Sequence, residues 1–221
     1  MASHTSKPKS AYEDVAYDER LDDLPSEDAL QRTVDNLEDR GFDVVVVDDA
    51  SAALDELKDR IPAGASIMNG HSTTLEEIGF VDYLSDDDHG WENLHDEIFA
   101  IDDEADAAAA RRESQTADYF LGSVNAIAQS GELVAADASG SRIGAYPFAA
   151  KNLLLVSGLN KVVADLDTAR ERLQNLAYRF ENARAQEEYG VESVVAKEFV
   201  YHFESDDDRT TLVLVRDRLG F

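Results

Sequence analysis

Four short segments combine polar side chains with glycine, a pattern that suits ligand binding. The first is Asn69-Gly70-His71-Ser72-Thr73-Thr74, and the second runs from Gly122 to Leu133 and holds Asn125 and Glu132. The third is Gly140-Ser141-Arg142-Ile143-Gly144, and the fourth is Gly158-Leu159-Asn160-Lys161. Hydroxyl, amide, guanidinium and ammonium groups all donate hydrogen bonds to carboxylates and phosphates. Together the segments predict a binding site for a small anion.

Each of these side chains also has a structural interpretation. Ser72 or Thr73 can simply cap a helix, and Lys161 can be a solvated loop lysine. Arg142 lies in a long acidic stretch, so it can clamp an anionic ligand or pair with any nearby acid. Glu132 is a weak candidate for a general base or nucleophile, and otherwise a solvated turn carboxylate. The residues alone leave these alternatives open.

The histidines give little support for a metal or catalytic site. Only His71 falls in a candidate segment, and it forms no recognisable triad with Ser72. His89 and His95 are flanked by acids, but their spacing matches no specific metal motif. We therefore predict no metal site, while leaving open whether His71 or the His89 and His95 pair binds one. No GxGxxG or Walker motif is present either.

The front of the chain alternates helical and strand patterns. Ser26 is a plausible cap for a helix that Gly41 closes, and residues 42–47 read as a strand buried on both faces. A helix capped by Ser51 and a strand at 65–68 follow, and a helical turn opens at Thr73. This alternation predicts an α/β fold with a Rossmann-like, mainly parallel sheet and flanking helices.

The back half continues with strands at 119–121, 133–136 and 152–156. Between the first two we expect a helical turn of small residues, and residues 140–147 read as a loop. Asp165 should cap a long helix, which should give way to a polar connection over residues 182–190. The strand patterns at 199–203 and 211–215 suggest a terminal hairpin. Because ligands gather at the carboxyl ends of parallel strands, the four polar segments should meet there.

The charge balance is strongly acidic. Among 221 residues, 47 Asp and Glu face 20 Lys and Arg, which gives a net charge of −27. Such a surface disfavours nucleic acid and anionic membranes as partners. Because the acids run along the whole chain and lysine is scarce, we interpret them as a halophile-like adaptation, in which salt relieves self-repulsion.

The chain contains no cysteine and no apolar run long enough to span a membrane. Disulfides, thiolate catalysis and a thiolate-bound iron–sulfur cluster of its own are excluded. The first residues lack the apolar core of an export signal, so we expect a cytoplasmic protein. We expect residues 1–24 to be a flexible, polar and acidic tail, and residues 25–221 to form one domain.

Several segments in order resemble the LUD-domain (lactate utilisation) family, in its short bacterial and archaeal type. Residues 69–79 (NGHSTTLEEIG) resemble its G-S-x-T-L-x-E-x-G segment, and residues 117–128 (ADYFLGSVNAIA) resemble a second family segment. Residues 131–142, 153–163 (LLLVSGLNKVV) and 212–221 resemble further family segments. The resemblance covers about residues 25–221, and it depends on the order and spacing of the segments together.

The resemblance implies a fold similar to the sugar-phosphate isomerase and CoA-transferase group. It also implies a role in oxidising lactate to pyruvate beside iron–sulfur partner subunits.

The chain departs from the family pattern at two places. Many relatives carry an acid just before the small-Gly turn, where this chain has Gln129-Ser130-Gly131, and some carry a cysteine cluster that residues 182–201 lack. Glu132 is close to the missing acid, but adjacent strand residues face opposite sides.

The leading functional prediction is therefore a protein of lactate-type organic-acid utilisation that binds a small anionic metabolite. We expect no cofactor on this chain, and any iron–sulfur cluster should reside in partner subunits. A non-catalytic binding or assembly module and a CoA-transferase-like or sugar-phosphate-isomerase-like enzyme are the alternatives. Whether the chain is catalytic, which ligand it binds and whether it forms a homo-oligomer are left open by the sequence.

Overall fold

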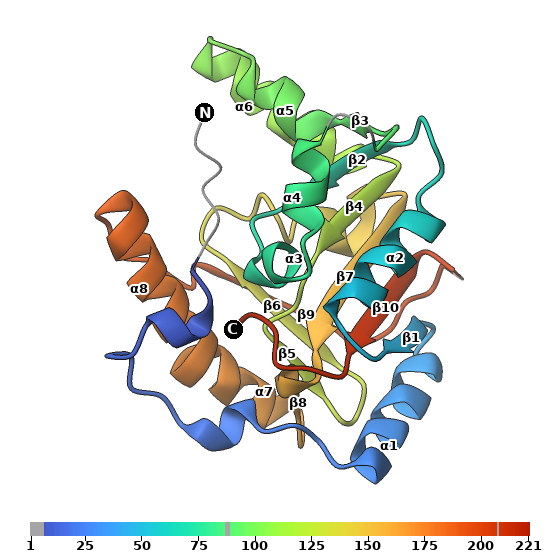
Figure 1. The fold of residues 1–221 in the computed structure, drawn as a ribbon, viewed down its shortest axis with the longest axis vertical. Helices are drawn as coiled ribbons and strands as arrows, with labels where there is room; N and C mark the ends of the chain where they lie inside the picture. The colour runs from blue at the N-terminus through green and yellow to red at the C-terminus, as the bar shows by residue number, and fades with distance from the viewer. Residues whose placement is uncertain (1–6, 87–88, 207) are drawn as a thin grey trace.

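The computed structural model describes residues 7–86, 89–206 and 208–221, which form two sheets covered by helices (Figure 1). The larger sheet has six strands, all parallel, in the order β1-β10-β7-β4-β2-β3. Its strands are β1 Asp43–Val47, β2 Ser66–Asn69, β3 Glu92–Asn93, β4 Tyr119–Gly122, β7 Asn152–Gly158 and β10 Thr210–Val215. The predicted α/β fold with a mainly parallel sheet is confirmed.

The centre of this sheet explains the apolar runs of the sequence. Every residue of β10 is buried, because β10 lies between β1 and β7, with Val213 in register with Val45 and Val156. Strands buried on both faces need continuous apolar sequence rather than alternation. The same expectation was wrong for β1, which lies at an edge of the sheet, pairs with β10 alone and is only half-buried.

A smaller mixed sheet, which the sequence did not reveal, packs beside the larger one. Its order is β8-β5-β6-β9, where β8 is Val162–Val163, β5 is Ala126–Ala128, β6 is Leu133–Asp137 and β9 is Lys197–Tyr201. β5 and β9 both pair antiparallel with β6, and β8 pairs parallel with β5. Two expectations were therefore wrong: β5 replaces the predicted helical turn, and β9 and β10 belong to different sheets rather than to one hairpin.

The helices lie on both faces of the larger sheet and against the smaller one. They are α1 Glu27–Glu38, α2 Ala50–Arg60, α3 Thr73–Glu77, α4 Phe80–Ser85, α5 Leu94–Phe99, α6 Glu104–Glu113, α7 Leu166–Arg172 and α8 Tyr178–Tyr189. Short 3₁₀ turns are η1 Lys9–Ala11, η2 Glu19–Asp22, η3 Ser114–Thr116 and η5 Leu159–Lys161, and π-helical turns are η4 Ala145–Ala149 and η6 Leu173–Ala177.

Side-chain caps fix where the helices begin. Ser26 and Asp165 accept hydrogen bonds from the backbone of α1 and α7, as the sequence predicted. For α2 the cap is Asp49 rather than Ser51. The expected polar connection over residues 182–190 was also wrong, because α7, η6 and α8 continue as helix until Gly190, whose left-handed φ of 69° ends it.

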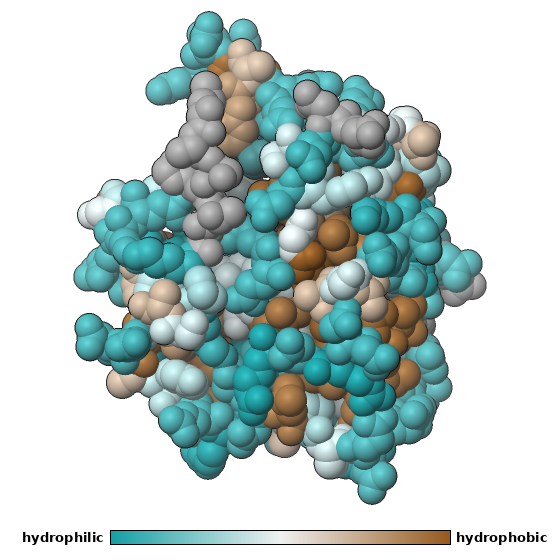
Figure 2. Space-filling view, in the orientation of Figure 1, coloured by the Kyte–Doolittle hydropathy of each residue, from teal (hydrophilic) through white to brown (hydrophobic). Residues whose placement is uncertain are grey.

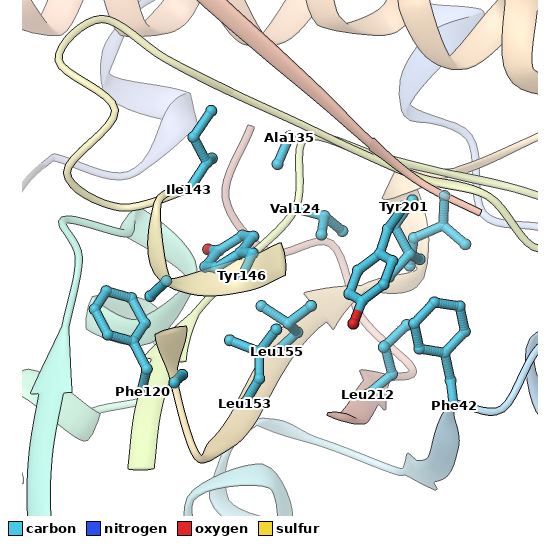
Figure 3. Close-up of a cluster of buried hydrophobic side chains, with 14 of the residues drawn as sticks. Phe42, Phe120, Val124, Ala135, Ile143, Tyr146, Leu153, Leu155, Tyr201 and Leu212 are labelled. Carbon is cyan, nitrogen blue, oxygen red and sulfur yellow. The ribbon is translucent and has the colours of Figure 1, made fainter. Parts of the chain in front are cut away.

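Alternation along the strands divides the core between the two faces of the larger sheet. Leu153, Leu155 and Leu212 point toward the smaller sheet, where they meet Ala135 and Tyr201 (Figure 3). In the same cluster the ring of Tyr146 packs edge-on against that of Phe120, with centroids 6.2 Å apart. The neighbouring residues, among them Leu154, Val156 and Val213, point the other way and are covered by α2, α3 and α4.

Both ends of the described chain pack on α7 and α8. Leu21 and Asp22 are buried, and the guanidinium of the fully buried Arg172 donates to the Leu21 carbonyl oxygen at 2.8 Å. Phe221 stacks on Phe180, with ring centroids 5.6 Å apart. The predicted boundary between tail and domain at residue 24 stays a prediction. Within the predicted tail, η2 packs on the domain, and residues 1–6 lie outside the described part.

Hydrophilic side chains cover most of the face in Figure 2, and hydrophobic ones are confined to smaller areas between them. Acidic residues outnumber basic ones by 27, since 47 minus 20 is 27, and the great majority of them are outside the core. Among the described residues, no helix is both long enough and apolar enough to cross a bilayer.

Candidate functional site

Three neighbouring strands of the larger sheet end beside one cleft, as the strand-end rule for parallel sheets predicts. The loops that follow β2, β4 and β7 supply residues 70–74, 123–125 and Lys161. The smaller sheet adds residues from the end of β6, and α8 and Phe221 close the remaining sides. The cleft has a volume of about 280 Å³. In Figure 1 the carboxyl terminus lies between α3 and α8, at this place.

Most of the predicted ligand residues are brought together here. Those that line the cleft are Gly70, Ser72, Thr73, Thr74, Asn125, Arg142 and Lys161. Their segments are up to 91 positions apart in the chain, since 161 minus 70 is 91. The parallel sheet brings most of them together, and the smaller sheet adds Arg142 from the loop after β6. That these residues bind a ligand stays a prediction; the structure supplies their common location.

Ser72 has the local role that its position in the sequence suggested. Its side-chain oxygen accepts the Leu75 backbone N–H at 3.3 Å and so caps α3. This bond directs the hydroxyl toward the helix backbone rather than into the cleft. Thr74, two residues later, is left to face the interior of the site.

Lys161 lies at the floor of the cleft and is only 2% exposed. Its Nζ lies 2.9 Å from Thr74 Oγ1, 3.0 Å from Ser123 Oγ and 3.1 Å from the Val124 carbonyl oxygen. No carboxylate of the described residues lies within ion-pair distance of this nitrogen. Burial therefore lowers the pKa of Lys161 well below the usual lysine value, and the positive charge of Arg172 lowers it further.

Arg142 crosses the face of Gly70 to reach the cleft. A Cβ at position 70 would lie 2.5 Å from Arg142 Cγ, so only glycine permits this close approach. The backbone N–H of Arg142 donates to Asp137 Oδ2 at 2.9 Å, and its Nη2 donates to the Ala136 carbonyl oxygen. In the part of the chain described, no carboxylate lies within 4.0 Å of its guanidinium nitrogens.

Asn125 is held in one orientation by bonds to the backbone. Its Oδ1 accepts the Ala136 N–H at 2.8 Å, and its carbonyl oxygen accepts a hydrogen bond from Arg172. Because Oδ1 faces the Ala136 N–H, the Nδ2 group points away from that donor. Nδ2 donates no hydrogen bond to any described residue, and it is therefore available to an acceptor in the cleft.

The outer wall of the cleft comes from residues that sequence reasoning missed. Tyr178, Glu181 and Arg184 lie on one face of α8, and Arg184 donates to Glu181 at 2.8 and 2.9 Å. Their i, i+3 spacing is the signal that could have revealed a common face. Ser123, Asp137 and Phe221 also line the cleft and were not predicted.

Three predicted site residues lie outside the cleft. Asn69 and Gly140 do not line it, although each lies beside a residue or segment that does. Glu132 lies at the turn between β5 and β6, where its carboxylate pairs with Arg40 at 2.7 Å. Burial alone would raise the pKa of Glu132, but hydrogen bonding from Ser130 and the charge of Arg40 outweigh it and lower that pKa. A paired carboxylate of low pKa is a poor general base at neutral pH.

The three histidines considered above lie in different surroundings. His71 lines the cleft, and its Nδ1 lies 3.5 Å from Glu76 Oε1. Burial of the ring lowers the pKa of His71, although 41% of the side chain is exposed. His89 stacks on Trp91, and His95 packs edge-on against Phe99. Within the described ranges, no three His, Cys, Asp or Glu side chains gather as a metal site would require.

Comparison with known proteins places this chain in a family. The model of the LUD domain matches residues 30–191, so the chain belongs to the LUD-domain family, which is linked to lactate utilisation. A crystal structure of a DUF162 family protein from Deinococcus radiodurans is similar, with a TM-score of 0.53 and 13% identity. The similarity covers 87% of this chain and 99% of that one, and at this identity it shows the fold alone. No curated protein matches the chain in sequence.

Proposed function

We propose that this protein binds a small organic-acid anion in the cleft and acts in lactate-type organic-acid utilisation. The observation that carries the proposal is Arg142. In a chain with 27 more acids than bases, its guanidinium lines a cleft without a carboxylate partner among the described residues. An unpaired guanidinium facing a cleft is suited to bind a carboxylate through two parallel hydrogen bonds.

The groups around Arg142 support the same ligand class. The Nδ2 group of Asn125 offers two N–H donors to a ligand in the cleft. Donors held in place by backbone bonds favour a ligand rich in acceptor oxygens, because such a ligand leaves no buried donor unpaired. A carboxylate held by Arg142 and Asn125 has this character.

The redox part of the proposal depends on partners. Oxidising lactate removes two electrons, and a chain without cysteine cannot hold a thiolate-bound iron–sulfur cluster to accept them. We therefore assign electron transfer to iron–sulfur partner subunits. The protein itself would bind and position the organic acid.

Glu132 favours a second candidate, a non-catalytic ligand-binding or assembly module. A glutamyl mechanism like that of CoA-transferases needs a free carboxylate in the ligand site. Glu132 pairs instead with Arg40 outside the cleft, and Gln129 stands where many relatives carry an acid. The CoA-transferase-like alternative is therefore the least favoured of the three.

The experiment that tests the proposal measures binding in molar KCl by calorimetry and thermal shift. Lactate, pyruvate, inorganic phosphate, a sugar phosphate and an acyl-CoA are the probes. Arg142→Ala should weaken lactate or pyruvate binding roughly 10- to 150-fold, because a hydrogen bond to a charged group contributes about 1.5–3 kcal/mol. Arg112→Ala is the matched control, since Arg112 forms no ion pair with any described residue either but lies on α6 away from the cleft.

Equal affinity in the Arg142→Ala and wild-type proteins would refute this site. Preferential binding of an acyl-CoA or a sugar phosphate would support the enzyme alternative instead. A separate co-purification from the native cell should recover an iron–sulfur oxidoreductase. If it recovers none, the role of redox partners is wrong, although the anion site can still stand.

A further inference from the structure

Lys161 carries an amine in the cleft that the proposed anion site does not use. The side chain lines the cleft, yet all three contacts of its Nζ are to uncharged oxygens: two hydroxyls and one backbone carbonyl. A lysine buried only for charge neutralisation would be expected beside a carboxylate, since burying an unpaired ammonium is costly. Three acceptor oxygens can satisfy the three N–H donors of an ammonium, but burial to 2% exposure without a carboxylate beside the nitrogen favours the neutral amine.

The hydrogen bonds are compatible with a neutral amine. Two N–H groups can donate to the Val124 carbonyl oxygen and to Ser123 Oγ, and the Thr74 hydroxyl can then donate to the nitrogen lone pair. The negative charge of Glu77 favours protonation of Lys161, but Glu77 Oε2 already accepts the Gly220 backbone N–H at 2.6 Å. The positive charges of Arg172, Arg142 and Lys9 oppose protonation of Lys161.

We propose that Lys161 Nζ forms an imine with the keto carbon of a short 2-oxo acid whose carboxylate is bound by Arg142. This inference rests on the proposed anion site and names the substrate class of that site. A 2-oxo acid carries its electrophilic carbon next to the carboxylate. One ligand can therefore place an anion at Arg142 and a carbonyl toward the floor where Nζ lies.

The step balances without a redox partner. The Thr74 hydroxyl turns away from the Nζ lone pair, which attacks the keto carbon, and the carbonyl π electrons move to the carbonyl oxygen. That oxygen takes up a proton that Nζ releases, with the hydroxyls of Thr74 and Ser123, at 2.9 and 3.0 Å from Nζ, as carriers. The carbinolamine then takes up a second proton on its oxygen, supplied by solvent at the open side of the cleft, and loses water, which leaves a protonated imine. Hydrolysis reverses the sequence.

The carboxyl-terminal residues restrict the size of the ketone. A Cβ at Gly220 would lie 2.4 Å from Thr74 Oγ1 and 3.1 Å from Lys161 Nζ, so this backbone packs directly over the amine. Phe221 lines the cleft next to it and is fixed by stacking on Phe180. A short, unbranched 2-oxo acid such as pyruvate fits this arrangement better than a branched one.

Reductive trapping tests the imine directly. The wild-type protein is incubated with pyruvate and sodium cyanoborohydride in molar KCl, and the modified residue is located by peptide mapping and mass spectrometry. We expect one reduced adduct, on Lys161. Lys161→Arg should abolish it, whereas Lys151→Arg should keep it, because Lys151 is exposed and pairs with Asp118. Lactate has no carbonyl and should give no adduct.

The outcomes separate this inference from the anion site. Two results would overturn the imine and leave the anion site intact. One is an adduct spread over Lys151 and Lys197, and the other is the absence of an adduct on Lys161 although pyruvate binds in calorimetry. Failure of pyruvate both to bind and to be trapped would overturn both. If Lys161→Arg does not fold, the wild-type peptide map decides, since it reads the modified position without a variant.

Discussion

The close approach of Arg142 to Gly70 gives the sharpest test of the site. Gly70→Ala removes no group from the cleft, and position 70 is not among the glycines with positive φ. The added Cβ would lie 2.5 Å from Arg142 Cγ and 2.9 Å from its Cβ and Cδ. Since ordinary van der Waals contact begins at 3.4 Å, the Arg142 side chain must retreat by about 0.9 Å, the difference between 3.4 and 2.5.

A shift of that size breaks a bidentate contact with an anion, because hydrogen bonds to a carboxylate need donor–acceptor distances near 2.7–2.9 Å. The loss should approach that of Arg142→Ala, about 1.5–3 kcal/mol, or roughly 10- to 150-fold in Kd. Calorimetric titration with lactate or pyruvate in molar KCl measures it. Thermal unfolding without ligand shows whether the fold is kept.

A double-mutant cycle supplies the control. If Gly70→Ala acts through Arg142, it should cost little further affinity in a protein that already carries Arg142→Ala. Two results would refute the reasoning: unchanged affinity in Gly70→Ala, or an equal loss from Gly70→Ala with and without Arg142. The second result would mean that the methyl group perturbs the β2 loop rather than the guanidinium.

Three further predictions concern Asn125, Tyr201 and the response of the protein to salt. Asn125→Asp keeps the oxygen that accepts the Ala136 N–H, so the fold should be retained. It replaces the Nδ2 donor with negative charge, so lactate affinity measured by calorimetry should fall at least about tenfold. Unchanged affinity would exclude Nδ2 as a ligand donor. Burial and the hydrogen bond to Glu204 raise the pKa of Tyr201 to about 12, so the folded state keeps a proton that the unfolded state loses near pH 10. Stability to urea should therefore fall as pH rises from about 10 to about 12, and less so in Tyr201→Phe; parallel pH profiles would contradict this. Thermal stability should rise from dilute buffer to molar KCl, where the Debye length is about 3 Å, and a melting temperature independent of salt would contradict the halophile interpretation.

The fold was predictable where one short segment determines its own structure. Ser26 and Asp165 mark helix starts through side-chain caps, and the apolar run of β7 identifies a buried central strand. The smaller sheet was not predictable in this way. β5 has three residues and β8 has two, too few to show a period, and pairing between β6 and β9 joins segments far apart in sequence.

The candidate site shows the same division. Gly70, Asn125 and Lys161 follow strands, and the rule for parallel sheets brings strand ends together whatever their distance in sequence. Glu132 lies outside the cleft, where its carboxylate pairs with Arg40, and this long-range pairing could not be read from the sequence. The α8 wall was missed because a helix rich in Glu and Arg is typical of a solvated face.

The distribution of charge sharpens what the acidity of the chain means. Six charged residues are buried in the described part of the protein, and four of them are basic: Lys161, Arg172, Arg184 and Arg209, against Asp22 and Glu204. The excess of acids therefore lies on the surface, while the described interior holds more basic than acidic side chains. In dilute buffer the long-range field of that surface repels an approaching anion before it reaches Arg142. Molar salt removes this long-range term but screens contacts inside the cleft much less. An anion should therefore associate faster as salt rises from dilute to molar, the reverse of the usual dependence for a site that binds anions through arginine.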